Sequence, residues 1–333
     1  MTPLVVAMGD PAGVGPETLA KAWEARVAHA LPPFVVVGDA RAVEAVWHGP
    51  ITRIDDLRNA TRSFDEALPV LSLLDAGTIV PGQPSADGAR AAFHALETAT
   101  GLAQSGAARA LVTAPVGKAQ MYHVGFTHPG QTEFVAERCG VARENAVMML
   151  AGPELRVVPI TTHVPLAAVP GLLSVELILA KVRVTARGLA KNFGIARPRL
   201  AFAGLNPHAG ESGALGREEI EVVEPAIARL RDEGIDIDGP LAADTMFHPR
   251  ARARYDAAIC CYHDQALVPL KTLHFDEGVN ITLGLPIVRT SPDHGTAFGI
   301  AGQDKAHPGA MIAAIAMADA AASNRRRYAA TCK

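Results

Sequence analysis

Three histidines follow three apolar stretches of the chain in the same way. His163, His208 and His263 come just after runs that cover residues 156–161, 199–203 and 257–262. If these runs are parallel strands, the histidines lie beyond their carboxyl ends, where open α/β sheets bind ligands. Neutral imidazole is the commonest protein ligand for a metal ion, and a three-histidine set leaves one coordination position open. The pattern therefore predicts a metal-binding active site.

The alternative is that each histidine only caps or hydrogen-bonds its own loop. The metal is favoured because Glu211, Asp264 and Gln265 stand beside the histidines, and carboxylates and amides commonly orient ligating imidazoles. Three imidazoles do not select one metal, so zinc, cobalt and magnesium stay open.

A second pattern concerns anion binding. Lys271, Asn280 and Arg289 recur every nine residues. Two cations and an amide can form a cradle for a phosphate or carboxylate, and Arg can bind such a group with two parallel hydrogen bonds. A set of solvated loop charges would give the same pattern, and both interpretations stay open on the residues alone.

Two glycine-rich segments could approach a ligand closely. Residues 9–17 follow a predicted first strand and open a helix, but they match neither G-x-G-x-x-G nor a P-loop. A structural turn and a ligand-lining loop explain them equally well. Residues 293–302 form a small-residue loop that could let a nucleotide reach backbone amides.

The elements that position these residues alternate between strands and helices. Apolar strand-like runs separated by helical patterns predict parallel sheets covered on both faces, hence an α/β fold. We expect two α/β/α domains with a cleft between them: residues 1–130 plus about 290–333, and about 131–289 with the histidines. The predicted strands are Leu4–Met8, Phe34–Gly38, Ala110–Thr113, Arg156–Thr161, Arg199–Ala203 and Ala257–Tyr262. The predicted helices are Gly88–Ser105, Ser174–Phe193, Glu218–Gly234 and Pro308–Ser323.

Composition excludes several classes of function. With 31 basic and 34 acidic residues the net charge is −3, and only Arg325–Arg327 forms a basic run, which argues against nucleic-acid binding. No apolar run reaches the roughly 18 residues of a membrane span. The first ten residues predict a strand rather than a signal peptide. Four cysteines, at positions 139, 260, 261 and 332, lack metal-site or disulfide spacing, so we expect a cytoplasmic protein with reduced thiols.

Together the motifs resemble those of the 4-hydroxythreonine-4-phosphate dehydrogenase family, which belongs to the isocitrate/isopropylmalate dehydrogenase-like fold. The resemblance spans nearly the whole chain, in the same order and with matching spacings. The motifs are GDPAGVGPE (9–17), TAPVGK (113–118), PGQTEF (129–134), LNPHAGE (205–211), GPLAADTMF (239–247), YHDQALVPLK (262–271), GVNITLGLPIVRTS (278–291) and DHGTAFGIAG (293–302).

The resemblance implies a role for each matching residue. His163, His208 and His263 would bind the divalent metal, with the third histidine coming from the partner subunit of a homodimer that shares its active sites. The substrate-binding positions are Thr132, Lys271, Asn280, Arg289 and Gln131, the last standing where the family usually has His. Candidates for acid–base catalysis are Asp244, Asp264 and Lys118, with metal-bound water as another. The cofactor, NAD or NADP, would lie along His294, Gly295, Thr296 and Ala297.

The implied reaction belongs to vitamin B6 biosynthesis. NAD would oxidise the C3 hydroxyl of 4-phosphooxy-L-threonine, and loss of CO₂ would give 3-amino-2-oxopropyl phosphate. Because Gln131 cannot carry the charge of a histidine, two alternatives stay open: another phosphorylated four-carbon acid and a cis-dihydrodiol carboxylate. From other classes, a phosphate acyltransferase of related fold, a three-histidine metal hydrolase and a binding protein are alternatives. We expect no nucleic-acid or membrane partner.

Overall fold

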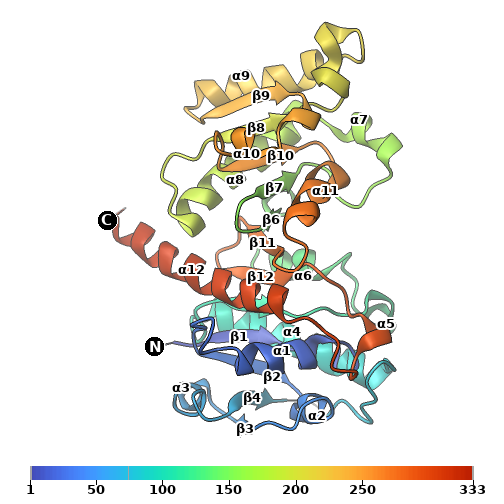
Figure 1. Ribbon diagram of the computed structural model, residues 1–333, viewed down its shortest axis with the longest axis vertical. Coiled ribbons are helices and arrows are strands. Elements are labelled where there is room, and N and C mark those ends of the chain that lie inside the picture. Colours follow the sequence, from blue (N-terminus) through green and yellow to red (C-terminus); the bar gives the residue numbers. More distant parts are fainter. Residues whose placement is uncertain (1, 74, 332–333) are drawn as a thin grey trace. The chain divides into compact units, whose positions relative to one another are not determined.

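The structure is a computed structural model that describes residues 2–73 and 75–331. The chain divides into two compact units. Unit 1 comprises residues 1–140 and 285–323, and unit 2 comprises residues 141–284 and 324–333. Both are built from strands and helices that alternate along the chain, labelled in Figure 1.

Unit 1 contains a parallel sheet with the strand order β3-β4-β2-β1-β5-β12. Its inner strands are fully buried runs of Val, Leu, Ala and Phe, which is typical of a sheet covered on both faces. Figure 1 shows α1 (Gly15–Glu24) and the first part of α12 (Gly309–Thr331) in front of this sheet and α4 (Ala86–Gln104) behind it. The strands are β1 (Leu4–Ala7), β2 (Phe34–Gly38), β3 (Ile51–Ile54), β4 (Leu68–Ser72), β5 (Leu111–Thr113) and β12 (Arg289–Pro292).

The helices of unit 1 begin at residues that suit helix starts. Ser85 caps α4 by accepting a hydrogen bond from the Gly88 amide, and Asp39 caps α2 by accepting one from the Arg41 amide. The helices are α1 (Gly15–Glu24), α2 (Ala40–Glu44), α3 (Ala60–Ser63), α4 (Ala86–Gln104), α5 (Lys118–His123), α6 (Gln131–Arg138) and α12 (Gly309–Thr331), which ends in unit 2.

Helix α6, which the sequence places in the second domain, lies in unit 1. The reason is an aromatic cluster: Phe134 of α6 packs edge-on against Phe93 of α4 and in a tilted arrangement against Phe126, with ring centroids 5.6 and 5.7 Å apart. Aromatic contacts of this kind contribute beyond the area they bury, and Phe134 is completely buried.

Unit 2 contains a mixed sheet with the strand order β11-β6-β7-β10-β8-β9. Strands β7, β10, β8 and β9 run parallel, whereas β6 pairs antiparallel with both β7 and β11. The prediction of parallel sheets is therefore wrong for β6 and β11. The strands are β6 (Val147–Ala151), β7 (Arg156–Pro159), β8 (Leu200–Ala203), β9 (Ile237–Leu241), β10 (Ala257–Cys260) and β11 (Val279–Leu283).

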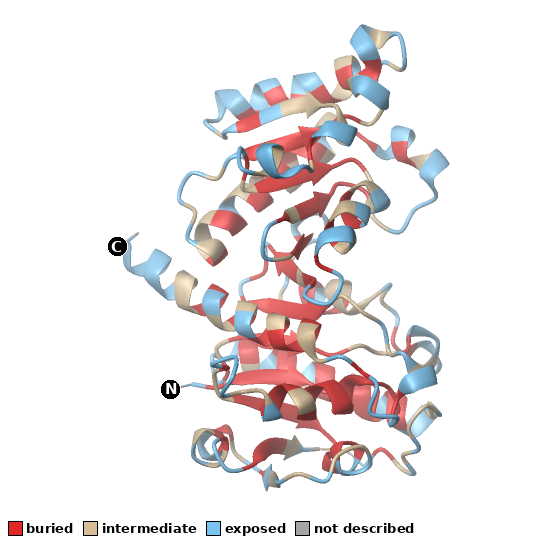
Figure 2. Cartoon of the chain, in the orientation of Figure 1, coloured by how far each residue is buried: buried red, intermediate tan, exposed pale blue. Residues whose placement is uncertain are grey.

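Helices and short turns cover this second sheet. Helix α8 begins at the Ser174 cap and ends at Gly194, whose φ of +70° is the left-handed conformation that stops a helix. Figure 2 shows the inner strands of both units as buried and the outer strands β3 and β9 as only partly so, with exposed surface on α7 and α11. The helices are α7 (Val169–Leu172), α8 (Val175–Phe193), α9 (Glu224–Asp232), α10 (Pro249–Arg252) and α11 (His263–Leu273). Shorter helical turns of this unit include η4 (Pro207–Gly213), η6 (Ala243–Thr245) and a π-helical turn, η5 (Glu219–Val223), whereas η7 (Phe298–Ile300) lies in unit 1.

The helices and the cysteines bear on two further expectations, on membrane spans and on thiol chemistry. Within the described residues, every helix is too short or too polar to cross a membrane. Cys260 and Cys261 are buried free thiols, and burial raises the pKa of both, so they are poor nucleophiles. Cys332 lies outside the described residues.

Candidate active site

Two of the three predicted ligand histidines lie together in unit 2. His163 follows β7 and His263 follows β10, and these strands are parallel neighbours in register. Their ladder continues past the strand ends, because the amides of Ile160 and Thr161 donate to the carbonyls of Cys260 and Cys261. The imidazole centroids are 5.5 Å apart and the rings are tilted by 44°.

Neighbouring side chains orient this histidine pair. The Nδ1 of His263 lies 2.6 Å from the Asp264 carboxylate, an arrangement that fixes the tautomer and leaves Nε2 for a ligand. Gln265 joins adjacent strand ends, since its Oε1 accepts from the Cys261 amide at 2.6 Å and its Nε2 donates to the Gly204 carbonyl at 2.7 Å. The carboxylate and amide expected around the ligands are therefore both present.

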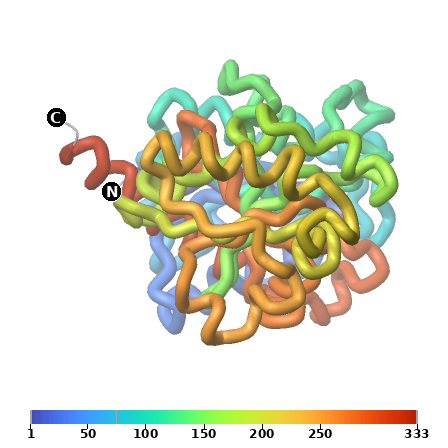
Figure 3. The backbone as a smooth tube through the Cα atoms, turned by 90° about the horizontal axis from the view of Figure 1, so that it is seen from above, coloured from blue at the N-terminus to red at the C-terminus, as the bar shows by residue number. Residues whose placement is uncertain are grey.

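His208 follows β8, the other neighbour of β10, but it does not join the pair. It stands in η4, where residues 208–212 all have positive φ, and Figure 3 shows this tight coil in yellow. Its side chain is 66% exposed, with Nδ1 3.6 Å from the Glu211 carboxylate. Among the described residues, no group of three or more His, Cys, Asp or Glu side chains could hold a metal ion. One chain therefore supplies two imidazoles at one place.

The left-handed turn has its own internal support. Non-glycine residues in this conformation cost about 1 kcal/mol each, so the turn needs compensating contacts. The buried Glu219 carboxylate accepts hydrogen bonds from the Asn206 amide at 2.8 Å and from its side-chain Nδ2 at 3.0 Å. A Cβ at Gly210 would lie 2.7 Å from Glu219, so the turn also depends on a glycine there.

An anion-binding group lies in unit 1 around Arg289. This side chain, on β12, is 3% exposed and donates to the hydroxyls of Thr132 at 3.1 Å and Thr113 at 2.7 Å. Burial lowers the pKa of Arg289 to about 10, partly offset by the nearby Glu133 carboxylate, so it is still a cation at neutral pH. Thr113, within the TAPVGK motif, is a contact that sequence reasoning missed.

Gln131 stands at the start of α6, next to Thr132. Its Nε2 donates to the Ala114 carbonyl at 3.1 Å, whereas its buried Oε1 has no hydrogen-bond partner among the described residues. A buried acceptor in this state costs free energy unless a ligand or water satisfies it. Gln131 can therefore accept one hydrogen bond from a bound molecule.

The other two predicted anion-binding residues, Lys271 and Asn280, lie on separate elements of unit 2. Lys271 is on α11, with its Nζ 5.8 Å from the centroid of the Phe275 ring. Asn280 is on β11, opposite Leu150 of β6, and its buried Oδ1 has no hydrogen-bond partner in the described chain. Arg289, by contrast, belongs to unit 1.

The predicted cofactor loop lies at the end of β12. His294 Nδ1 is 2.9 Å from the Gly295 carbonyl oxygen, and its buried Nε2 has no hydrogen-bond partner within the described residues. Gly295 and Gly299 have open space where a Cβ would stand. Ala297, with φ of +44°, precedes the η7 turn. A buried ring nitrogen beside exposed glycine backbone suits a polar ligand.

The three catalytic candidates are all exposed and occupy different elements. Asp264 is the second residue of α11, Asp244 lies in η6, and Lys118 begins α5. Sequence reasoning assigned no role to Asp10, a 2%-exposed carboxylate just after β1 that accepts a hydrogen bond from the Ala12 amide. Burial raises the pKa of Asp10 above its ordinary value, although hydrogen bonds from the Ala12 and Gly117 amides oppose the shift.

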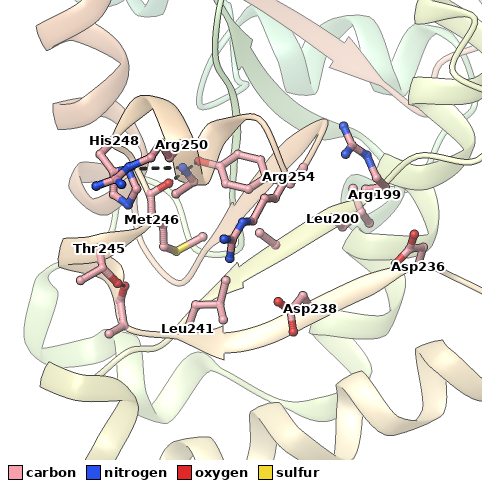
Figure 4. A pocket seen from close by; sticks show the side chains of 14 residues that line it. Arg199, Leu200, Asp236, Asp238, Leu241, Thr245, Met246, His248, Arg250 and Arg254 are labelled. Atoms are coloured by element: carbon pink, nitrogen blue, oxygen red, sulfur yellow. Dashed lines mark hydrogen bonds between the residues drawn. The ribbon is translucent and has the colours of Figure 1, made fainter.

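A cavity of about 720 Å³ in unit 2 contains none of these residues. Figure 4 shows Arg250, Arg254 and His248 around it, with Leu241 and Met246 on its apolar side. Because its lining includes neither the histidine pair nor the anion-binding residues, we exclude it from the candidate site.

Comparison with known proteins identifies the family. The family model described as pyridoxal phosphate biosynthetic protein PdxA matches residues 30–318. A relative from Zymomonas mobilis, named 4-hydroxythreonine-4-phosphate dehydrogenase, is 57% identical over 329 residues, covering 99% of this chain and 98% of its own.

Solved structures agree with this match. The crystal structure of 4-hydroxythreonine-4-phosphate dehydrogenase from Klebsiella pneumoniae has a TM-score of 0.86 at 38% identity, covering 97% of this chain and all of that one. A terephthalate 1,2-cis-dihydrodiol dehydrogenase from Burkholderia xenovorans has a TM-score of 0.65 at 28% identity, covering 96% and 98% of the two chains.

The fold and these relatives define an oxidoreductase of the dehydrogenase class. The chain belongs to the PdxA family, and its role is in pyridoxal phosphate biosynthesis. The α/β fold, the family and the biosynthetic role expected from the sequence are confirmed.

Proposed function

We propose that this chain oxidises 4-phosphooxy-L-threonine at its C3 hydroxyl with NAD and releases CO₂, giving 3-amino-2-oxopropyl phosphate. The observation that carries the proposal is the His163–His263 pair, 5.5 Å apart beyond the carboxyl ends of two adjacent parallel strands. The name of the relative at 57% identity supports the choice of substrate.

The histidine pair fits a metal ion as an incomplete donor set. We propose that His163 and His263 hold one ion together with His208 from a second copy of the chain, in a homodimer. The partner then gives the second histidine of the sequence and not the third, which the family resemblance implies, because His263 lies beside His163 in one chain. The 66% exposure of His208 supports donation to a partner, because its side chain extends from a turn into solvent. Three imidazoles favour zinc or cobalt over magnesium, which prefers oxygen ligands. When bound, the ion supplies Lewis-acid stabilisation of negative charge on the substrate oxygen.

The cofactor loop fits a nicotinamide dinucleotide. The His294 Nε2 that lacks a hydrogen-bond partner among the described residues, and the open backbone at Gly295, can contact a polar ligand, with Thr296 and Ala297 continuing the loop. NAD, when bound, accepts the hydride. We propose NAD rather than NADP, because the described loop residues 293–302 contain no Lys or Arg to pair with an additional phosphate.

The chain's own residues bind and orient the substrate. Arg289, a buried cation whose direction is fixed by two threonine hydroxyls, would bind the phosphate together with Thr132. Gln131 offers its Oε1 as an acceptor, and Lys271 and Asn280 are further substrate-binding residues that the family resemblance implies. Asp244, Asp264 and Lys118 are the candidates to move the hydroxyl proton. Remote binding of this kind orients the reacting carbon.

Gln131 favours one second candidate, a dehydrogenase for a cis-dihydrodiol carboxylate. An uncharged amide reduces the positive charge available to a phosphate dianion, and the terephthalate dihydrodiol enzyme shares 28% identity over nearly the whole chain. Arg289 does not distinguish the two candidates, because its buried charge suits phosphate or carboxylate equally.

A substrate panel tests the proposal. The purified chain is assayed by nicotinamide absorbance with 4-phosphooxy-L-threonine, with unphosphorylated 4-hydroxy-L-threonine and with a cis-dihydrodiol carboxylate, each with NAD or NADP and with or without a chelator. We expect turnover with the phosphorylated substrate and NAD, abolished by the chelator and restored by zinc or cobalt. Faster turnover of the dihydrodiol would establish the second candidate instead, and chelator-resistant turnover would contradict the metal site.

Reduced thiols at Cys260 and Cys261 agree with a cytoplasmic enzyme, which we also propose.

A further inference from the structure

The GDPAGVGPE segment contacts the cofactor loop, and the family resemblance assigns no role to these contacts. Residues 9–17 connect β1 to α1, and all their contacts described below lie within unit 1. The Val14 amide donates to the Thr296 carbonyl at 2.9 Å. A Cβ at Gly13 would lie 3.0 Å from that same carbonyl oxygen, so glycine permits the two backbones to approach.

Glu17 extends this contact along the following residues. Its side chain is almost completely buried, yet both carboxylate oxygens have partners. Oε1 accepts from the Ala306 amide at 2.9 Å and Oε2 accepts from the Gly302 amide at 3.2 Å. The carboxylate therefore joins the two ends of the 302–306 turn, directly after the cofactor loop.

Lys21, one helical turn further along α1, holds the middle of the same turn. Its Nζ donates to the Asp304 and Ala306 carbonyls at 3.0 and 2.9 Å, to the Asp304 carboxylate at 2.8 Å and to Glu17 at 3.0 Å. Burial lowers the pKa of Lys21, but the hydrogen bonds to Asp304 and Glu17 outweigh it and raise the pKa, so the side chain is cationic.

The 302–306 turn needs such support. Asp304 has φ of +58°, a conformation that costs a non-glycine residue about 1 kcal/mol. Its apolar contact is small: Val14, Ala301 and Ala306 form one minor cluster. Residues 302–305 are exposed, so the polar contacts to α1 supply most of what fixes this turn.

We propose that Glu17, with Lys21, is a positioning pair for the cofactor: it fixes residues 296–306 so that the loop at His294–Ala297 meets the dinucleotide in one conformation. We call the contacts of Glu17 and Lys21 with residues 302–306 the clamp. The clamp rests on contacts within this chain, whereas its ligand, NAD, rests on the proposed function. A carboxylate is required because two backbone amides point at it, and an amide side chain would turn an NH₂ group towards one of them.

Glu17→Gln tests the pair by two measurements, neither of which depends on turnover. Lys305 is exposed within the clamped turn, so trypsin cleavage after it, followed by mass spectrometry, reports how often the turn opens. We expect cleavage to be faster by about tenfold, since one buried amide loses its partner. The Kd for NADH, measured by fluorescence, should rise by a similar factor of about ten.

A second variant and a matched control make the result specific. Lys21→Met removes the contacts to Asp304 from a partly exposed position, and we expect about threefold faster cleavage. Glu24→Gln makes the same chemical change on the same helix, where the carboxylate accepts from Trp47 instead, and should alter both measurements less than about twofold. Circular dichroism checks that each variant is folded.

The outcomes separate this inference from the function it builds on. Faster cleavage with weaker NADH binding in both clamp variants supports the positioning role. Unchanged cleavage after Lys305 overturns the clamp. Faster cleavage with unchanged NADH affinity overturns the positioning role, because the loop then binds equally well when loosened. A wild-type chain that binds no dinucleotide overturns the proposed function, and with it the role assigned to the pair.

Discussion

The cofactor loop and the His208 turn carry predicted ligand-binding residues, and each is held by a buried glutamate, Glu17 or Glu219, but they present those residues differently. The cofactor loop is joined to α1 by backbone contacts and by the buried Glu17. The His208 turn has residues 208–212 in the left-handed conformation, with its histidine exposed to solvent. The contacts that hold the cofactor loop all come from its own chain. The His208 turn presents a ligand outward, as a contribution to another molecule's site would require.

The largest expected effect concerns the histidines. His208→Ala should remove the metal and lower kcat/KM by about 10³-fold or more, because the ion stabilises charge worth several kcal/mol. The fold should change little, since the side chain is exposed. Metal content by atomic spectroscopy and circular dichroism check this, and full turnover without metal would contradict it.

Mixing variants sharpens the test, because a shared site predicts which pairs complement. In a heterodimer of His208→Ala with His263→Ala, one site regains all three imidazoles. Random reassortment should then restore about a quarter of wild-type activity. The control, His163→Ala with His263→Ala, should restore none, because those residues lie side by side in one chain. No recovery in either mixture would show that His208 acts in its own chain.

Arg289→Lys comes next, as a test of the anion-binding group in unit 1. Lysine keeps a charge but cannot donate to Thr113, Thr132 and the substrate in the same fixed directions. We expect KM for the phosphorylated substrate to rise about 100-fold with a smaller change in kcat. Steady-state kinetics measure it; an unchanged KM would exclude Arg289 from substrate binding.

A smaller effect is expected at Asp10, at the start of the segment that holds the cofactor loop. Its pKa is raised in the folded chain, mainly by burial, so the folded state binds its proton more tightly than the unfolded state does. Stability from this group is therefore present at low pH and lost as pH rises through the raised pKa. Asp10→Asn should raise the melting temperature at pH 7 by about 2 °C, with the difference vanishing near pH 3. A lower melting temperature at pH 7 would show that ionised Asp10 stabilises the loop.

The smallest effect is expected in the cavity beside α10. Arg254→Ala should leave kcat and both KM values within about twofold of wild type, because exposed residues outside a site rarely matter. A larger change in either constant would include the cavity in the functional machinery.

The sequence predicts the apolar elements well and the polar ones poorly. The run Phe34–Gly38 is a strand with the predicted bounds, and 257–260 and 200–203 agree closely, because continuous Val, Ile and Ala patterns specify buried strands. Strand β12, with the sequence Arg-Thr-Ser-Pro, is fully buried but was not predicted. Its polar side chains find tertiary partners: Thr290 donates to the Ala314 carbonyl, and Arg289 donates to Thr113 and Thr132.

The sequence likewise predicts the placement of some site residues and not of others. Strand order brings His163 and His263 together, as expected from histidines that follow parallel strands. The turn that separates His208 from them depends on backbone torsions in residues 208–212, for which the sequence offers Gly210 as the one local sign. The sequence assigns no role to Asp10 or Glu17, because a carboxylate after a strand or in a first helical turn is common. The partners of Glu17 lie nearly 300 positions away in the chain.

The position of β12 has a consequence during synthesis. Unit 1 begins with residues 1–140, but the strand that pairs with β5 arrives only with residues 289–292. At about 5–20 residues per second, a ribosome needs roughly ten seconds or more to make the intervening segment. Throughout that interval the nascent chain carries an unprotected sheet edge, the kind of edge that recruits chaperones or pairs wrongly with other chains.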